Sequence, residues 1–248
     1  MKHGKKTKIN CIQLIFIIIL IASICGIVCY LCIANKEKQE YKNLQENMAT
    51  ENHTDEKSDR IEKVKELQKE NSDIVAWIEI EGTNINYPVL HTTNNDFYLN
   101  YNYKKEETLA GSLFLDKDFD IKNGSSNYLI YGHRNKQGLM FEDLLKYAKE
   151  DFYKEHKKIR FTTDKEDRDY EIMAVFYSRV YYKDEQNVFR YYYFVNAKDE
   201  NEYNNYVKQS KDASIYDTGV TAKYGEQLLT LSTCEYSQED GRFVIVAK

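Results

Sequence analysis

Cysteine is scarce in this 248-residue chain, and its distribution is uneven. Of the five cysteines, four lie near the N-terminus, namely Cys11, Cys25, Cys29 and Cys32. Cys29 and Cys32 form a C-x-x-C pair, which in an apolar helix is more typical of small core-like side chains than of a redox or zinc site. Cys234 is the only cysteine in the rest of the sequence. That part of the chain cannot form an internal disulfide, so packing alone must hold its core.

The chain also lacks an excess of positive charge. Its 35 Lys and Arg residues are outnumbered by 40 Asp and Glu residues, which gives a net charge of −5. Nucleic-acid binding depends on basic clusters that contact phosphates, so the composition argues against a nucleic-acid partner. The tyrosines between Tyr177 and Tyr193 have acidic neighbours and predict a groove wall or barrel surface rather than base stacking. No convincing metal-ligand spacing is present, and we expect neither a metal nor another cofactor.

One segment lacks charge altogether. Residues 9–35 contain no Asp, Glu, Lys or Arg, and the run from Ile12 to Ala34 is dominated by apolar side chains. About 20 apolar residues suffice to span a bilayer as a helix. A cleaved signal peptide usually has a shorter apolar core of about 7–15 residues and a small-residue cleavage site, which is missing before Lys36. The segment predicts an uncleaved transmembrane helix over residues 9–35.

The charges on either side of this segment predict its orientation. Lysines precede it, whereas lysines and glutamates that follow it largely cancel. The positive-inside rule then places residues 1–8 in the cytoplasm and everything after the helix outside the cell. We therefore expect a single-pass protein of the cell membrane, with a polar stalk over residues 36–57 and an extracellular domain over residues 58–248.

The extracellular domain is predicted to be mainly β with helical decoration. Asp59 is a candidate helix cap, followed by an apolar stripe at Ile61, Val64 and Leu67. A second helix is predicted over residues 140–156, with Phe141, Leu144, Leu145 and Ala148 facing the core, and a third over about 198–211, with Tyr203 and Val207 inward. Alternating or apolar runs predict strands near 74–81, 85–90, 112–115, 128–133, 159–162, 170–182, 226–234 and 242–247. Pro88 should lie at an edge or a bulge because it cannot donate to a ladder. Many short strands with few helices favour a β-barrel.

The last two predicted strands bring a thiol and a guanidinium together. Leu229 and Leu231 alternate with Thr230 and Ser232, as in a half-buried strand. If residues 235–241 form the connecting loop, Cys234 and Arg242 become cross-strand neighbours. A nearby cation favours the reactive thiolate. A small buried cysteine and a solvated arginine are the plainer alternative for either residue alone, but their coincidence favours a nucleophilic site.

A thiol nucleophile also needs a proton donor. The chain has five histidines, of which His3, His53 and His156 are predicted to be solvated, and His91 fits an ordinary loop. His133 closes the apolar strand NYLIYG and lies at a strand-to-loop exit, where functional residues are often held. It precedes Cys234 by 101 positions, so only the fold could join the two residues.

These motifs resemble those of a known family. TLSTC (230–234), the downstream Arg242 and the upstream YGH (131–133) resemble the active-site strands of sortases, the cell-wall transpeptidases of Gram-positive bacteria. Class B sortases are matched in particular by WIEIEGTNINYPVL (77–90), NNDFYLNYN (94–102), AGSLFLD (110–116), YLIYGHRN (128–135), the helical segment near 198–211 and YDTGV (216–220). The resemblance covers about residues 60–248. It implies a sortase-type eight-stranded β-barrel with an N-terminal helix and a helical insertion before the last two strands, preceded by one transmembrane helix.

The same resemblance implies roles for individual residues. Cys234 corresponds to the nucleophile, His133 to the acid/base and Arg242 to the group that stabilises the oxyanion or orients the substrate. Places that line the substrate groove in class B sortases are matched by Asn95, Leu99, Tyr131, Ser232 and Glu235.

The implied function is cell-wall anchoring of proteins. A cysteine transpeptidase of this kind cleaves a C-terminal sorting signal after Thr, forms a thioester and joins the secreted protein to an amine of a peptidoglycan precursor. Two alternatives remain open at this point. One is a pilin-polymerising or mainly hydrolytic thiol peptidase of the same fold, and the other is a non-enzymatic, membrane-tethered wall-binding module.

Overall fold

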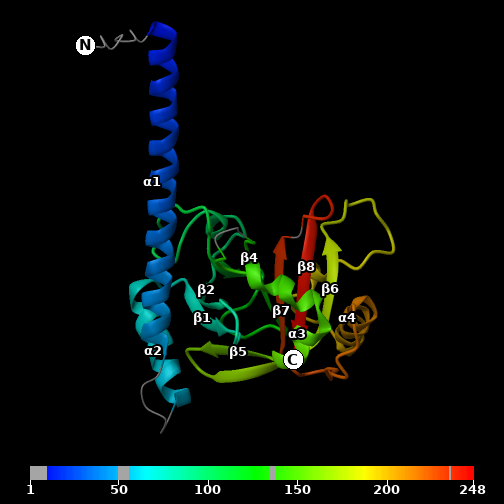
Figure 1. Ribbon diagram of the computed structural model, residues 1–248. Helices are drawn as coiled ribbons and strands as arrows, with labels where there is room; N and C mark the ends of the chain where they lie inside the picture. The colour runs from blue at the N-terminus through cyan, green and yellow to red at the C-terminus, as the bar shows by residue number, and fades with distance from the viewer. Residues whose placement is uncertain (1–9, 50–55, 135–137, 235) are drawn as a thin grey trace, which may run out of the picture. The chain divides into compact units, whose positions relative to one another are not determined.

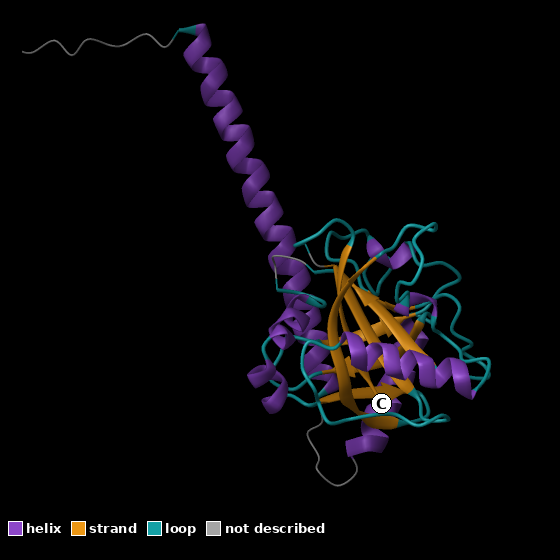
Figure 2. Cartoon of the chain, turned by 90° about the vertical axis from the view of Figure 1, so that its right-hand side faces the viewer, coloured by secondary structure: helices purple, strands orange, loops and turns teal. Residues whose placement is uncertain are grey.

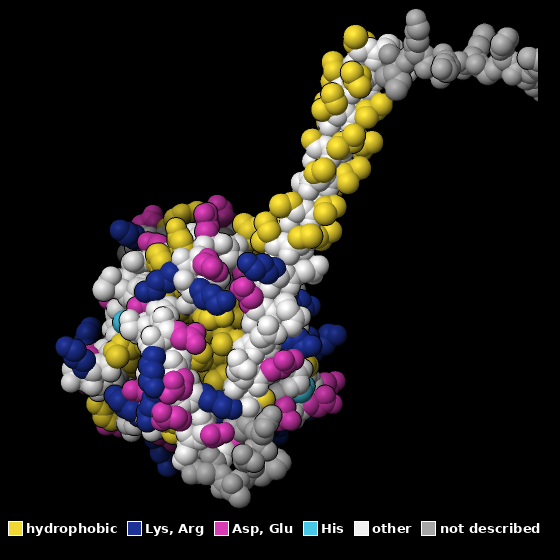
Figure 3. Space-filling model, turned by 90° about the vertical axis from the view of Figure 1, so that its left-hand side faces the viewer, with side chains coloured by type: hydrophobic (Ala, Val, Ile, Leu, Met, Phe, Trp, Pro, Cys, Tyr) yellow, Lys and Arg dark blue, Asp and Glu magenta, His cyan; other side chains and the backbone are white. Residues whose placement is uncertain are grey.

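The computed structural model describes residues 10–49, 56–134, 138–234 and 236–248. The chain forms two compact units, Met1–Glu46 and Asn47–Lys248. The first unit contains most of helix α1 (Cys11–Met48), which is long and apolar enough to cross a membrane. The apolar side chains of residues 11–33 are exposed, for example Ile12 and Phe16. Figure 3 shows hydrophobic side chains along the projecting part of the helix. Such exposure is costly in water, and a lipid environment removes the cost.

The second unit is built on a closed barrel of eight strands (Figures 1 and 2). The strands run around the barrel in the order β1-β2-β3-β4-β7-β8-β6-β5. Their bounds are Ile74–Glu79 (β1), Asn86–Leu90 (β2), Leu113–Leu115 (β3), Asn127–Gly132 (β4), Lys158–Thr163 (β5), Asp167–Arg179 (β6), Leu228–Cys234 (β7) and Gly241–Ala247 (β8). The predicted eight-stranded barrel is confirmed. Closure removes the free sheet edges that an open sheet would expose.

Pro88 lies in strand β2, which has a neighbour on each side but is paired on only one side at this residue. It is paired with Trp77 of β1, whereas β3 pairs with β2 only at Val89 and Leu90. Locally Pro88 therefore has an unpaired flank, as the prediction of an edge position requires, although β2 as a whole is not an edge strand. Pro88 is accommodated because the pairing with β3 begins one residue after it.

The helices cover parts of the barrel and differ in detail from the prediction. Helix α2 (Glu56–Glu70) begins before Asp59 and buries Val64 and Arg60. Helix α4 (Glu200–Ala213) is the predicted insertion, and the side chain of Asp199 caps it by accepting a hydrogen bond from the Glu202 N–H at 2.8 Å. Short 3₁₀ turns occur at Phe97–Leu99 (η1) and Tyr191–Tyr193 (η3).

The single helix predicted over residues 140–156 was wrong. The segment consists of a 3₁₀ helix, η2 (Glu142–Ala148), and an α-helix, α3 (Glu150–Glu155), separated by the extended residue Lys149. Phe141, Leu144 and Tyr147 are fully buried. Their spacing of three matches the 3₁₀ period, which places Tyr147 rather than Leu145 or Ala148 in the core.

Strand β7 is buried on both faces, not on one as its alternation predicts. Each residue from Leu228 to Thr233 is buried. The polar face of β7 is covered by η3 and α4, whose tyrosines form hydrogen bonds with its hydroxyl groups. The Tyr206 hydroxyl bonds to that of Thr230, and the Tyr191 hydroxyl bonds to that of Ser232, both at 2.8 Å. Buried hydroxyls that are paired in this way carry little desolvation cost. The strand that ends in Cys234 is thereby held rigidly.

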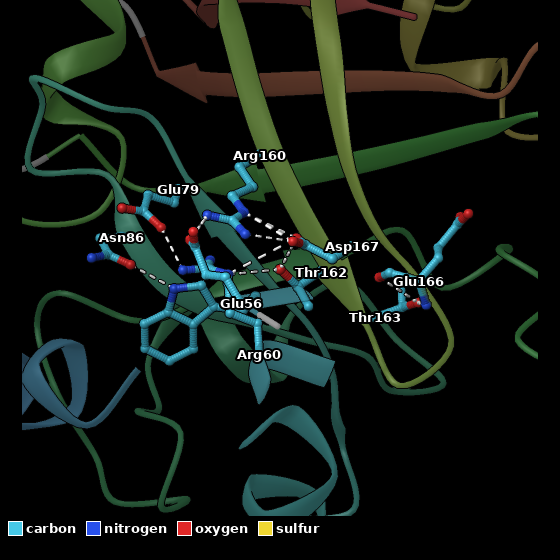
Figure 4. A network of polar contacts seen from close by, with 10 residues as sticks. Glu56, Arg60, Glu79, Asn86, Arg160, Thr162, Thr163, Glu166 and Asp167 are labelled. Atoms are coloured by element: carbon cyan, nitrogen blue, oxygen red, sulfur yellow. Dashed lines mark hydrogen bonds and ion pairs between the residues drawn. The ribbon is translucent and has the colours of Figure 1, made fainter. Parts of the chain in front are cut away.

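Helix α2 is fixed to the barrel by a network of charges (Figure 4). The Arg60 side chain is 5% exposed and forms an ion pair with Glu79 of β1 at 2.8 Å. Its Nε donates to the hydroxyl of Thr162 at 3.3 Å. Arg160 of β5 bonds to Asp167 of β6 at 2.6 Å and also to Glu56 of the helix. Because Arg60 and Asp167 are buried, each of these two charges depends on its partners being present.

Candidate active site

The thiol predicted to be a nucleophile lies at the last position of strand β7. Cys234 is the cross-strand partner of Arg242 in β8, so the predicted pairing of these two residues is confirmed. Its thiol is free and partly accessible. Directly paired positions on antiparallel strands have Cβ atoms about 5 Å apart, and both residues line the same groove.

The strand register also explains why His133 lies next to Cys234. Strand β4 runs parallel to β7, and Gly132 is paired with Thr233. The next residues along the two strands, His133 and Cys234, therefore leave the barrel side by side. A separation of 101 positions in the sequence becomes adjacency because two parallel strands end at the same level.

The His133 ring is oriented by a backbone carbonyl. Its Nε2 lies 2.8 Å from the oxygen of Leu99, at the end of η1. A carbonyl oxygen only accepts, so Nε2 carries the proton. Nδ1 is therefore the ring nitrogen whose protonation can change during a reaction.

Gly111 leaves room for this contact. Its φ of +61° favours glycine, and an added Cβ would lie 2.6 Å from the Leu99 oxygen and 3.0 Å from Cδ2 of His133. Any side chain at residue 111 would have to move the carbonyl that holds the imidazole. The requirement for glycine here comes from both backbone conformation and close approach.

The Arg242 guanidinium is held partly by its own turn. Nη1 donates to the carbonyl oxygens of Gly241 at 2.9 Å and Asp240 at 3.2 Å. With Nη1 anchored in this way, Nε and Nη2 are the nitrogens through which the planar fork can bind an oxygen of a ligand. Burial raises the pKa of the nearby Tyr191 phenol above its ordinary value, although its bond to Ser232 and the Arg242 charge act in the opposite direction.

A groove of about 240 Å³ joins these residues into one site. It contains the three predicted catalytic residues and four of the five predicted substrate-binding residues, Asn95, Leu99, Tyr131 and Ser232. The fifth, Glu235, lies outside the described residues. The remaining lining residues, to which the resemblance gave no role, are Phe114, Gly132, Val180, Tyr191, Tyr192 and Thr233.

Two of these additional residues had a signal in the sequence. Tyr191 and Tyr192 belong to the tyrosine-rich stretch that predicted a groove wall or barrel surface, and they do line the groove. Phe114 and Val180 gave no such signal, because an apolar residue beside a strand end looks the same whether it faces a core or a groove. Among residues 10–49, 56–134, 138–234 and 236–248, no group of three or more His, Cys, Asp or Glu side chains could hold a metal ion.

Comparison with known proteins decides the family. The sortase domain family matches residues 78–248. The chain belongs to the sortase family. It is 35% identical to sortase B of Listeria monocytogenes over 189 residues, which cover 75% of this chain and 74% of that protein. It is also 31% identical to sortase B of Staphylococcus aureus over 247 residues, covering 98% of this chain and 97% of the relative.

Solved structures agree with this assignment. A sortase B–substrate complex from Staphylococcus aureus matches with a TM-score of 0.75 at 29% identity, covering 86% of this chain and 96% of the other. Sortases are cysteine transpeptidases, and the chain is an enzyme of that type. A non-enzymatic wall-binding module is therefore no longer a competing interpretation.

Proposed function

We propose that this enzyme cleaves a C-terminal sorting signal after Thr and transfers the protein to an amine of a peptidoglycan precursor. Cys234 is the nucleophile, His133 the acid/base and Arg242 the oxyanion-stabilising group. The observation that carries the proposal is the strand register, which pairs Cys234 with Arg242 and brings His133 to the adjacent strand end. The groove that these residues share is the place for the sorting signal.

In the first step, the Cys234 thiolate attacks the backbone carbonyl carbon of the Thr at the cleavage site. The carbonyl electron pair moves to its oxygen, where the Arg242 guanidinium stabilises the negative charge. When the oxyanion collapses, the C–N bond breaks and Nδ1 of His133 delivers a proton to the departing amine. The product is a thioester between Cys234 and the sorted protein, together with the released C-terminal peptide.

In the second step, an amine takes the place of the departed peptide. Its lone pair attacks the thioester carbon, the C–S bond breaks and Cys234 leaves as thiolate. His133 accepts the proton that the attacking amine loses, which returns the site to its starting state. The Leu99 carbonyl supports both steps, since it holds the protonated Nε2 and keeps Nδ1 directed to the reaction.

We further propose that helix α1 anchors the enzyme in the cell membrane, with the N-terminus in the cytoplasm and the barrel outside. Support comes from the length and apolar character of α1 and from the lysines before it. An external barrel would meet secreted substrates as they emerge. Protease digestion of intact cells tests this orientation: the barrel should be cut away from outside, and full protection would contradict it.

A product analysis tests the transferase reaction. The full chain in detergent is incubated with peptides of the Asn-Pro-Xaa-Thr and Pro-Xaa-Thr-Gly types, each with and without a glycine oligopeptide as amine. We expect cleavage after Thr and a ligated product that requires the amine. Hydrolysis unaffected by amines would support a hydrolytic peptidase, and ligation only to the side-chain amine of N-acetyl-lysine would support a pilin polymerase.

A further inference from the structure

A buried carboxylate outside the proposed catalytic residues lies directly behind the groove. Asp116 follows strand β3 and is 4% exposed. One of its oxygens, Oδ2, accepts hydrogen bonds from Nδ2 of Asn95 at 2.9 Å and from the hydroxyl of Tyr131 at 3.1 Å. Both donors line the groove. Its other oxygen, Oδ1, accepts from the backbone N–H of Asp118 at 2.9 Å and closes a local turn.

The contacts of Asn95 fix which way its amide points. Nδ2 donates to Asp116, and Oδ1 accepts from the backbone N–H of Lys117 at 2.8 Å. A carboxylate only accepts and a backbone N–H only donates, so the reversed orientation would place donor against donor and acceptor against acceptor. One Nδ2 hydrogen is used by Asp116, and the second is the one that Asn95 can offer to a ligand.

Tyr131 is fixed in the same manner. Burial, and to a smaller extent the charge of Asp116, raise the pKa of its phenol, so the hydroxyl stays protonated and donates to the carboxylate. With its hydrogen directed to Asp116, the phenol oxygen can only accept from a ligand. Asp116 thus makes one lining residue a donor and the other an acceptor.

We propose that Asp116 is a positioning residue for substrate binding, which acts through Asn95 and Tyr131 to preset the hydrogen-bonding pattern of the groove. This inference rests on the proposed function, because it assigns a peptide to the groove. A preset pattern lowers the cost of ordering side chains when the peptide binds. Asp116 itself touches neither the peptide nor the reacting atoms.

Asp116→Asn tests this role sharply. The new amide retains one oxygen that can accept from the Asp118 N–H, so the turn can persist. Its NH₂ group then faces two donors, the Asn95 amide and the Tyr131 hydroxyl, which must both reorient. Asp118→Asn is the matched control, because it removes the same charge from an exposed side chain two residues away.

Two measurements on the full chain in detergent separate groove positioning from general damage. For Asp116→Asn, we expect kcat/KM for the sorting-signal peptide to fall by about tenfold or more. The rate of Cys234 alkylation by iodoacetamide, a reagent too small to need the groove, should change by less than about twofold. Asp118→Asn should leave both rates unchanged. Peptide kinetics close to wild type in Asp116→Asn, or a parallel loss of alkylation, would overturn the inference.

A double variant that exchanges the two side chains, called the swap, distinguishes a role in the hydrogen-bonding pattern of the groove from a role in loop stability. Combining Asp116→Asn with Asn95→Asp restores a donor–acceptor pair between the two positions but removes the N–H that residue 95 offers to the groove. We expect the swap to recover melting temperature and not peptide kcat/KM, whereas full recovery of kcat/KM would reduce Asp116 to a structural role. If the wild type cleaves no peptide, the proposed function fails. A crystal structure of Asp116→Asn then tests the inference alone, because unmoved Asn95 and Tyr131 side chains would contradict it.

Discussion

At the scale of single residues, the site depends on groups that hold the reacting atoms as much as on the reacting atoms themselves. The Leu99 carbonyl selects the protonated nitrogen of His133, and the Gly241 and Asp240 carbonyls hold one end of the Arg242 guanidinium. In both cases a backbone oxygen orients a side chain that the mechanism uses. Backbone oxygens are suited to this task because the fold fixes their positions.

Replacement of Arg242 by lysine tests the role of the planar fork. The charge next to Cys234 is retained, but the paired N–H donors are lost. For Arg242→Lys we expect kcat for peptide cleavage to fall by about 10²–10³-fold, as when an oxyanion donor is removed. Steady-state kinetics measure this, with Arg168→Lys, at the ring of Tyr170, as the control. An active Arg242→Lys enzyme would show that only the charge matters.

Gly111→Ala tests the support behind His133. The added Cβ would press on the Leu99 oxygen and the imidazole, so activity should fall by about tenfold or more while the barrel stays folded. Gly124→Ala is a close control, because Gly124 also has a positive φ of +79° but has no atom within 4 Å of an added Cβ. Gly124→Ala should lose about 1 kcal/mol of stability because of its positive φ, and Gly111→Ala should lose more because its Cβ also meets backbone oxygens. Equal activities in the two variants would contradict the steric argument.

At the scale of elements, helix α2 is attached to the barrel through buried charges rather than a broad apolar face. Removing the Arg60 side chain leaves Glu79 without its ion-pair partner and weakens the surroundings of Asp167. We expect Arg60→Ala to lower the free energy of unfolding by about 3 kcal/mol. Lys65→Ala, which breaks an exposed pair with Glu62, should cost less than about 0.5 kcal/mol. Urea denaturation measures both, and similar losses would show that the network contributes little.

Elements with a strong local pattern could be predicted from the sequence. The strands, the α4 insertion and the pairing of Cys234 with Arg242 all follow from alternation, capping and a loop of plausible length. The break at Lys149 could not be predicted, since Phe141, Leu144 and Tyr147 satisfy a period of three only in their tertiary setting. The full burial of β7 was missed for a similar reason: distant tyrosines of η3 and α4 cover its polar face.

In the candidate site, too, some residues could be predicted from the sequence and others could not. Motifs identified the thiol, the guanidinium and the imidazole, because their residue types carry the chemistry. Asp116 ends the AGSLFLD match and was given no role of its own, yet it is buried behind the groove. Its two partners, Asn95 and Tyr131, are 21 and 15 positions away, so no local pattern indicates the contact.

At the scale of the whole molecule, stability should depend on pH through a half-buried histidine. Burial lowers the pKa of His91, although the backbone and the charges of Asp116 and Asp73 act in the opposite direction. The unfolded chain therefore takes up a proton more readily than the folded chain, and the free energy of unfolding falls as pH drops below about 6.5. As the pH is lowered from 7.5 to 5, the melting temperature should fall less steeply for His91→Gln than for the wild type. An identical pH dependence in the variant would contradict this assignment.

The most direct test of the whole account is to trap the acyl-enzyme. The full chain is incubated with the intact sorting-signal peptide that it cleaves. Intact-mass spectrometry should then show the N-terminal peptide fragment attached to Cys234. Hydroxylamine should release it, as expected of a thioester. Cys234→Ala should form no adduct and release no peptide. Cleavage that persists in Cys234→Ala would contradict the proposed mechanism.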